Sequence, residues 1–264
     1  MSIENINQAA GAMNALTARM NGFVNDADVQ IAQRRAAYDG LANNLKNVVN
    51  NQMYFLGYVY PDEPNPTLID GGTFNTIKQC IEAAPSGSYV YVRLETDKIH
   101  HVSGGIAVLN RNVQISSFGG GERPIIDFGV SSEGTYNSMG HFAPDMGGSV
   151  RFSYAELRLP TVKADDALPW SATRTAVLYR TAAVVVVGID SCVVIGGEAT
   201  GLVSCNGAST ALVSAYNSQL SGNVFLITAK VSGAAVISKQ SLTLSDGALL
   251  YSTDGIVGEN VIQN

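Results

Sequence analysis

Residues 73–94 read TFNTIKQCIEAAPSGSYVYVRL and contain the signals of a short helix followed by a strand. Small or apolar side chains recur there at i, i+3, i+4 and i+7, namely Ile77, Cys80, Ile81 and Ala84. This spacing predicts an amphipathic helix with one buried face, which ends at Pro85 because proline cannot continue a helix. After a turn at residues 86–88, residues 89–94 alternate as a strand with one buried face does.

Towards the C-terminus, short runs rich in β-branched residues recur with turn residues between them. The runs are Val113–Ser116, Ile125–Phe128, Val150–Ser153, Val184–Val187, Val193–Ile195, Leu212–Ser214, Val224–Thr228, Ala234–Ile237, Leu242–Leu244 and Leu249–Tyr251. Beyond residue 180 they recur roughly every eight to twelve residues, with no helix long enough for a βαβ unit. A β-sandwich would also give this spacing. A single-stranded β-helix explains it better, because each coil consists of such strands joined by tight turns.

Residues 1–53 have a different character, with no proline and with Ala, Asn and Gln throughout. Alternating steps of three and four residues, starting at Ile3, meet apolar side chains at every position except Thr17, Arg34 and Gln52. This register continues for about seven heptads and predicts a coiled coil of roughly 75 Å.

The residues predicted to form the oligomerisation seam are Ile3, Ile6, Met13, Met20, Val24, Ile31, Tyr38, Leu41, Leu45 and Val48. Leu16 and Phe23 widen the apolar stripe, which favours three or more helices over two. A broken helix is the alternative, because each glycine in a helix interior costs up to about 1 kcal/mol. In that case Asn21-Gly22 would form a turn, and a helical hairpin would pack on the rest of the chain.

Between these regions, residues 54–60 predict a strand, and residues 61–66 contain three prolines. Prolines at this density continue neither a helix nor a central strand. The sequence therefore predicts three parts: a helical stalk or attachment segment at residues 1–53, a strand with a Pro-rich linker at residues 54–69, and a β-helix domain at residues 70–264.

The 264-residue chain has a net charge of −6 and an isoelectric point near 5.0, and only 14 % of its residues are charged. A nucleic-acid partner would require clustered Lys and Arg, which the sequence lacks. The longest apolar run, residues 182–189, is too short to span a bilayer, and the first residues do not match a secretory signal. The scattered Cys80, Cys192 and Cys205 are expected to be buried free thiols.

Residues 76–87, TIKQCIEAAPSG, resemble the pattern T-I-x-x-A-I-x-A-A-P-x-G at the N-terminal cap of pectin-lyase-like right-handed β-helices. Residues 111–115 and 119–126 resemble the first coils of that superfamily. The resemblance implies a right-handed parallel β-helix whose open end is closed by the helix, which would cover an apolar cross-section and a free strand edge. The sequence departs from the family at residues 97–102, where the pattern G-x-Y is missing.

The combination of a helical N-terminal segment, a Pro-rich hinge and a capped β-helix resembles bacteriophage tail fibre and tailspike proteins. These proteins are typically homotrimers that attach to the virion through the N-terminal region and contact the host surface through the distal β-structure. The resemblance implies a structural virion protein, assembled in the host cytoplasm, with other tail proteins as partners, a host-surface glycan as ligand and no cofactor.

A β-helical polysaccharide depolymerase is the alternative function. Glycoside hydrolysis needs two carboxylates about 5–9.5 Å apart in one groove, and the candidates are Asp165, Asp166, Asp190 and Glu198. Asp165 and Asp166 are neighbours that would point to opposite faces of a strand, and Asp190 has the position of a turn residue. His100, His101 and His141 lack metal-ligand spacing. No catalytic or metal-binding residue is therefore assigned, and a purely structural tail connector is the second alternative.

Aromatic residues in the loop of residues 131–148, together with the single tryptophan, are the candidates for binding a glycan. They are Tyr136, His141, Phe142 and Trp170. Aromatic rings bury a large area against sugar rings at a low cost in rotamer freedom. The alternative is that Phe142 and Trp170 fill the side or the end of the β-helix.

Overall fold

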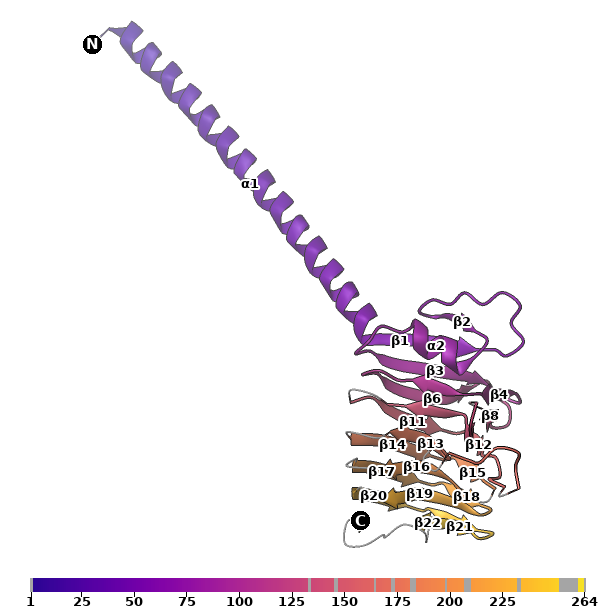
Figure 1. Cartoon of the computed structure of the whole chain (residues 1–264). Coiled ribbons are helices and arrows are strands. Elements are labelled where there is room, and N and C mark those ends of the chain that lie inside the picture. Colours follow the sequence, from indigo (N-terminus) through magenta and orange to yellow (C-terminus); the bar gives the residue numbers. More distant parts are fainter. Residues whose placement is uncertain are drawn as a thin grey trace. The chain divides into compact units, whose positions relative to one another are not determined.

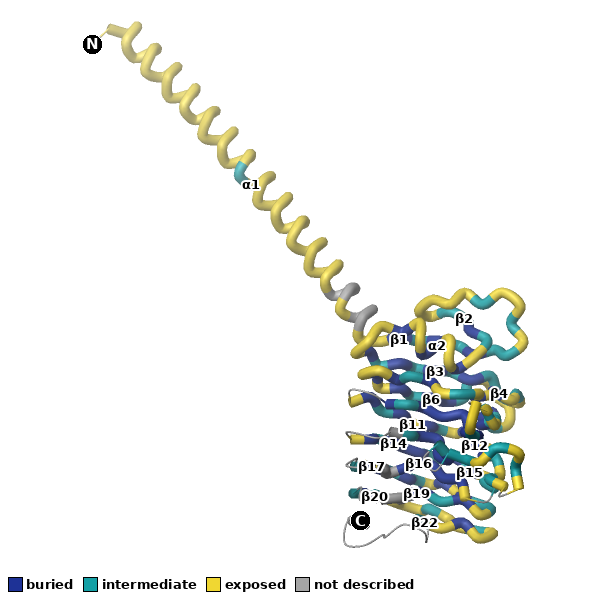
Figure 2. The backbone as a smooth tube through the Cα atoms, in the orientation of Figure 1, coloured by how far each residue is buried: buried dark blue, intermediate teal, exposed yellow. Residues whose placement is uncertain are grey.

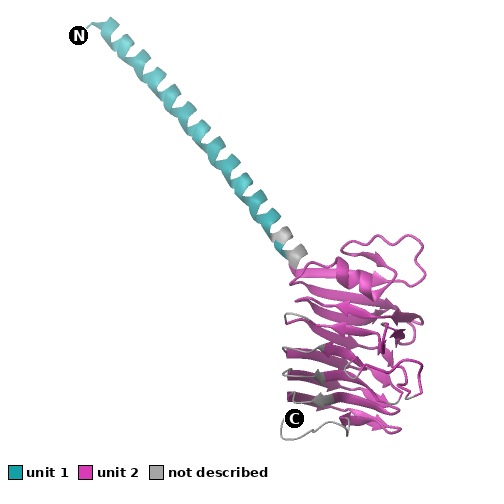
Figure 3. Cartoon of the chain, in the orientation of Figure 1, with its two compact units in different colours: residues 1–50 teal, residues 51–264 magenta. Residues whose placement is uncertain are grey.

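The computed structural model describes residues 2–132, 134–144, 147–163, 165–171, 174–180, 184–197, 199–206, 210–231, 234–251 and 261–263. The chain divides into two compact units, residues 1–50 and residues 51–264 (Figure 3). The first unit is helical, and the described strands belong to the second.

The helix α1 (Ile3–Met53) is continuous over 51 residues. The predicted helix is confirmed, and the alternative turn at Asn21-Gly22 is not formed. No proline interrupts the segment, so every interior residue can donate to the backbone hydrogen-bond ladder. At this length the helix measures about 75 Å.

The second unit contains three parallel sheets, named A, B and C (Figure 1). Sheet A has the order β2 (Gly72–Phe74), β1 (Tyr54–Val59), β3 (Tyr89–Glu95), β6 (Asn112–Phe118), β11 (Ser149–Ser153), β14 (Val184–Asp190), β17 (Thr210–Tyr216), β20 (Ala234–Gln240) and β23 (Val261–Gln263). Sheet B has the order β4 (Ile99–Val102), β7 (Ile125–Phe128), β12 (Glu156–Arg158), β15 (Val193–Ile195), β18 (Gln219–Ser221) and β21 (Thr243–Ser245). Sheet C has the order β5 (Gly105–Ala107), β10 (His141–Ala143), β13 (Ala176–Arg180), β16 (Thr200–Asn206), β19 (Val224–Val231) and β22 (Leu249–Tyr251). The strands β8 (Val130–Ser132) and β9 (Asn137–Met139) form an antiparallel hairpin beside them.

Successive strands enter sheets A, B and C in turn. The chain passes from β3 to β4 and β5, then through β6, β7 and β10, and then through β11, β12 and β13. Each strand pairs in parallel with the strand that enters the same sheet one round later, as Val90 pairs with Val113 and Val113 with Val150. The prediction of a mainly β protein with parallel strands and a long N-terminal helix is therefore confirmed.

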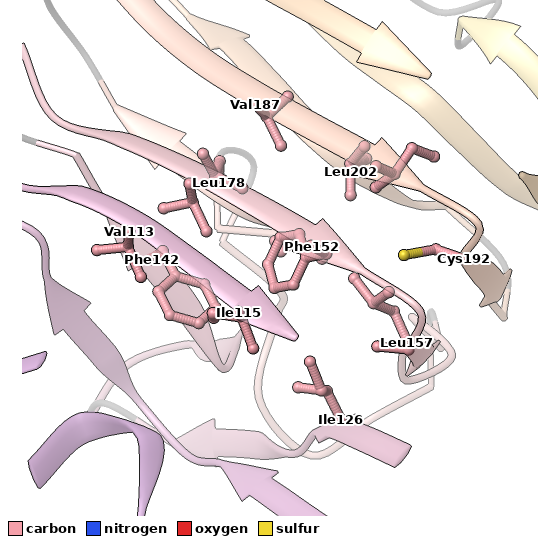
Figure 4. Close-up of a cluster of buried hydrophobic side chains, with 14 of the residues drawn as sticks. Val113, Ile115, Ile126, Phe142, Phe152, Leu157, Leu178, Val187, Cys192 and Leu202 are labelled. Atoms are coloured by element: carbon pink, nitrogen blue, oxygen red, sulfur yellow. The ribbon is translucent and has the colours of Figure 1, made fainter. Parts of the chain in front are cut away.

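One hydrophobic core contains side chains from all three sheets (Figure 4), and buried positions recur along the strands of the second unit (Figure 2). Equivalent positions of successive strands supply Val90, Val113, Val150, Val187, Val213 and Ile237 from sheet A, Ile126, Leu157, Val194 and Leu220 from sheet B, and Ile106, Phe142, Leu178, Val203 and Ile227 from sheet C. All of these side chains are buried. In sheets A and B the core position alternates with an outward residue, as the period of a strand requires.

The helix α2 (Ile77–Ala83) is the amphipathic helix predicted from residues 73–85, and it packs on β1 and β3. Its first turn carries a capping box: Thr76 Oγ1 accepts a hydrogen bond from the Gln79 N–H at 3.1 Å, and Gln79 Oε1 accepts one from the Thr76 N–H at 3.2 Å. At its other end, the guanidinium of Arg111 donates two hydrogen bonds to the Ala84 carbonyl, at 2.6 and 3.0 Å. The buried face includes Cys80, and burial raises the pKa of this thiol to about 12.

We expect Thr76→Ala to lower the free energy of unfolding of the second unit by about 1 kcal/mol, because the substitution removes the acceptor of the capping box. Thr76→Ser keeps a hydroxyl in place and should leave the stability close to that of the wild type. Urea unfolding followed by the fluorescence of the single tryptophan, Trp170, measures both. Equal unfolding midpoints for the alanine variant and the wild type would contradict this role of the box.

The strand predicted at residues 54–60 is present as β1, and it belongs to sheet A. It pairs with β3 from Tyr54–Tyr89 to Val59–Leu94. Phe55 and Val59 are buried in the core, which explains why the strand joins the sheet. The proline-containing segment that follows is a loop between β1 and β2. A hydrogen bond holds this loop in place: Asn75 Nδ2 donates to the Glu63 carbonyl oxygen at 2.6 Å.

Candidate functional site

The apolar stripe of α1 is exposed along its described length. Ile3, Ile6, Met13, Met20, Val24, Ile31, Tyr38, Leu41 and Leu45 are all exposed, whereas the side chain of Val48 lies outside the described residues. Leu16 and Phe23, which widen the stripe, are exposed as well, and Phe23 retains 76 % of its accessible surface. A single helix with so many exposed apolar side chains gains no packing energy in water. The stripe therefore has the character of a surface that a partner covers.

Two of the predicted glycan contacts are core residues. Phe142 is fully buried in sheet C, where its ring lies 5.7 Å from that of Phe152 (Figure 4). The ring of Phe128 lies 6.2 Å away. His141 is 5 % exposed, and its Nδ1–H donates to the Met139 carbonyl at 2.9 Å. The prediction that these two side chains contact a glycan is wrong. The segment contains the strand β10, which packs Phe142 into the core, where the sequence suggested an exposed loop.

Tyr136 and Trp170 are both partly exposed and lie near each other. Asn137, the neighbour of Tyr136, forms a parallel β-bridge with Trp170, whose indole N–H donates to Asp166 Oδ2 at 2.6 Å. The guanidinium of Arg174 lies over the ring of Tyr136 at 5.4 Å. Trp170 also packs against the hydrophobic core. A contact of Tyr136 or Trp170 with a sugar stays a prediction.

The carboxylates considered for catalysis are not gathered in one groove of the described structure. Asp165 is exposed, and Asp166 binds the indole of Trp170. Asp190 ends the strand β14 and lies 3.8 Å from the guanidinium of Arg151. Glu198 lies outside the described residues.

The two neighbouring histidines have separate surroundings. His100 is buried at the first strand of sheet B, where Nε2 lies 2.9 Å from the Glu95 carbonyl oxygen, and burial lowers the pKa of its imidazole. His101 points outwards, and its Nδ1 lies 3.0 Å from Asp127 Oδ2. Their opposite orientations follow from the alternation of β4. In the part of the chain that the structure describes, no three His, Cys, Asp or Glu side chains lie together as metal ligands would.

A polar groove of about 410 Å³ lies on the outward side of sheet B. Its lining residues are Glu122, Arg123, Ile125, Tyr154, Glu156 and Arg158. They come from two successive rounds of the chain, because β7 and β12 pair in parallel and place Ile125 beside Glu156. Neighbouring strands thus bring together residues about thirty positions apart in the sequence.

The groove combines hydrogen-bond donors, acceptors and an aromatic ring. Arg158 Nε donates to Glu156 Oε1 at 2.6 Å, and the guanidinium of Arg123 lies 5.0 Å from the centre of the Tyr154 ring. Arg123 Nε is buried and has no hydrogen-bond partner among the described groups. Guanidinium donors beside carboxylate acceptors match the hydroxyl groups of a sugar, which both donate and accept. The groove therefore presents hydrogen-bond groups of the kinds that a polyhydroxylated ligand uses.

The sequence contained no local signal for this groove. Glu122 and Arg123 follow a glycine run that indicates a turn, and Glu156 and Arg158 alternate on a three-residue strand. Only the parallel pairing of β7 with β12 makes them neighbours.

Together these features define a mainly β protein of parallel sheets, preceded by a long helix with an exposed apolar stripe. Comparison of the chain with protein-family models, curated proteins and solved structures finds no match. Among the described helices, none is both long and apolar enough to cross a membrane.

Proposed function

We propose that the protein is a trimeric structural fibre of a bacteriophage virion, which attaches to a glycan on the host surface. The observation that carries the proposal is the apolar stripe on the 51-residue helix α1, which is exposed along its described length in the single chain. A heptad stripe widened by Leu16 and Phe23 suits the association of three helices. The N-terminal region would then join the copies and attach them to other tail proteins.

We further propose that sheets A, B and C form one right-handed β-helix with α2 as its cap. Two features support this architecture. Successive strands enter the three sheets in a constant order, and every pair within these sheets is parallel. The helix α2 packs on the first strands, where a solenoid would otherwise expose an apolar end.

Light scattering on the full chain tests the trimer. Three copies of 27.8 kDa have a mass of about 83 kDa, which is the expected result at micromolar concentration. A mass of 27.8 kDa would reject the trimeric fibre, because α1 would then remain unpaired or fold onto its own chain.

We expect the groove on sheet B to be the glycan contact. The test is binding of the full chain to an array of bacterial surface polysaccharides, compared with the variant Tyr154→Ala. Loss of the ring should weaken binding about tenfold or more, since one stacking aromatic contributes on the order of 0.5–1.5 kcal/mol beyond the area that it buries and three copies bind together. Gln219→Ala, on the same sheet but outside the groove, is the control and should bind as the wild type does. Equal binding by all three proteins would exclude the groove as the site.

A polysaccharide depolymerase is the second candidate, because the groove contains two carboxylates, Glu122 and Glu156. Such a pair could act as acid and nucleophile, or as acid and base, in glycoside hydrolysis. Incubation of each bound polysaccharide with the protein, followed by an assay of new reducing ends, separates the two functions. Our proposal expects no new ends. Release of ends by the wild type and its loss in Glu156→Gln would make the protein an enzyme.

A further inference from the structure

The strand β4 buries a histidine at a position where the other strands of sheet B carry aliphatic side chains. β4 is the edge strand of sheet B, and its residues alternate between the outside and the inside. His100 therefore lies in the interior beside its pairing partner Ile126 on β7, and it is 3 % exposed. An imidazole that is buried to this degree depends on hydrogen bonds within the protein.

Only one of the two ring nitrogens of His100 has such a hydrogen bond. Nε2 lies 2.9 Å from the Glu95 carbonyl oxygen. Because a carbonyl only accepts, Nε2 carries the proton of the neutral ring and Nδ1 keeps a lone pair. Nδ1 is buried as well, and it has no hydrogen-bond partner among the described groups. A second proton would therefore create a buried cation whose new N–H has no acceptor.

His100 lies next to the helix α2, which packs at the same end of the sheets (Figure 1). His100 and the first residues of the helix, Thr76 and Ile77, line one cavity of about 180 Å³. The helix also contacts β4 and β5, which are the edge strands of sheets B and C. A charge on the imidazole would draw water into this cavity, so α2 is the element that it would displace.

The ion pairs described around His100 do not include its ring. The charged and titratable side chains on the surrounding elements are Arg93 and Glu95 on β3, His101 on β4, Asp127 on β7, Lys78, Cys80 and Glu82 on α2, and Asp62, Glu63 and Lys98 in the adjoining loops. The pairs join Lys98 to Asp62, Lys78 to Glu82, and His101 to Asp127. Burial lowers the pKa of the His100 imidazole from its ordinary value of 6.5, the Glu95 carbonyl partly offsets this effect, and His101 lowers the pKa further.

We propose that α2 is an acid-sensitive cap, which separates from the edge strands when His100 takes up a proton. Above about pH 6.5 the imidazole is neutral whether the cap is closed or open, and the cap has its full stability. As the pH falls below this value, the open form binds a proton that the closed form does not, so the equilibrium shifts towards opening. Opening uncovers the free edges of β4 and β5, with which a strand of another chain could pair. The inference does not depend on the proposed fibre.

Hydrogen exchange of the full chain, read by mass spectrometry at about pH 7.5 and about pH 5, tests the proposal. The exchange rates are corrected for the intrinsic effect of pH, so that they report the opening equilibrium of each segment. We expect residues 77–84 to open about fivefold or more at the lower pH, because an unsatisfied buried donor changes an equilibrium by at least this factor. Residues 211–215 on β17, several strands away in sheet A, should keep their protection.

Two variants assign the response to one ring. His100→Gln keeps an amide donor for the Glu95 carbonyl but does not titrate, so its cap should open equally at both pH values. His101→Gln removes the exposed neighbour and should open in acid as the wild type does. A wild type whose cap does not open in acid would overturn the proposal. The same acid opening in His100→Gln would also overturn it, because another group would then cause the response.

His100→Gln could lose the cap even at neutral pH, and the wild type then decides by itself. Nuclear magnetic resonance follows the protonation of each imidazole in the wild type. We expect His100 to protonate at a lower pH than His101, together with the loss of protection in residues 77–84. Protonation of His100 while α2 stays protected would overturn the proposal.

Discussion

Replacement of both Ile31 and Leu41 by aspartate is expected to convert a particle of about 83 kDa, three times 27.8 kDa, into single chains. Both side chains belong to the exposed stripe of α1 and would face the seam of a trimer. Each substitution exchanges a buried aliphatic group for a carboxylate, and an unpaired buried charge costs several kcal/mol. Two such changes in each chain should cost more free energy than the association of the helices supplies, because several seam positions are small or polar. Light scattering gives the mass directly.

The matched control is the pair Gln33→Asp and Asn43→Asp. These substitutions add the same charge to the same helix, but each position lies about 200° around the helix from the seam residue two places before it. The control should remain trimeric. Far-ultraviolet circular dichroism should show strand signal in both variants, because the β-structure has a core of its own. A trimeric mass for the double variant at Ile31 and Leu41 would contradict the seam.

The substitution with the largest expected effect on stability is Phe142→Ala. Phe142 is fully buried between Phe128 and Phe152 and pairs across sheet C with Ile106 and Leu178. Truncation of a buried phenylalanine costs about 3–5 kcal/mol, because it removes apolar contacts and leaves a cavity that a packed core closes only in part. Urea unfolding followed by the fluorescence of Trp170 measures the loss.

Ile195→Ala is the surface control for this experiment. Ile195 is 40 % exposed on the outward side of sheet B, so its truncation should change the free energy of unfolding by less than about 1 kcal/mol. Phe142→Ala also separates the two roles that the sequence suggested for this residue. A folded variant with unchanged stability and weakened polysaccharide binding would indicate that Phe142 contacts the ligand. That result would contradict its role in the core.

The elements that local patterns predicted are those with long or repeated signals. The stripe from Ile3 to Leu45 repeats often enough to indicate a helix, and α1 is continuous across it. The β-branched runs predicted strands such as β7, β15 and β22, and all three are present. Residues 73–85 predicted α2 because helix spacing and a terminal proline coincide within one short stretch.

The elements that the sequence did not reveal are short or lie where its pattern resembles a loop. The strands β5, β10 and β12 have three residues each, too few for an alternation to be recognised. His141 and Phe142 lie in one of them, which is why they were taken for loop residues that bind a glycan. The strand predicted at residues 54–60 is present as β1, but its place in sheet A beside β3 was not predicted, because the prolines after Tyr60 indicate a break in structure and end only the strand.

The sequence by itself determined the two-part character of this protein: a long helix with an apolar stripe, followed by short strands joined by turns. Both depend on contacts between residues a few positions apart, so a local sequence pattern predicts them. The tertiary structure alone decided which side chains share a surface. Glu156 lies beside Ile125, and Leu212 lies between Val186 and Val236, because parallel pairing aligns residues about 24 to 31 positions apart. That register depends on the length of each turn, so the groove on sheet B emerges only when the chain has folded.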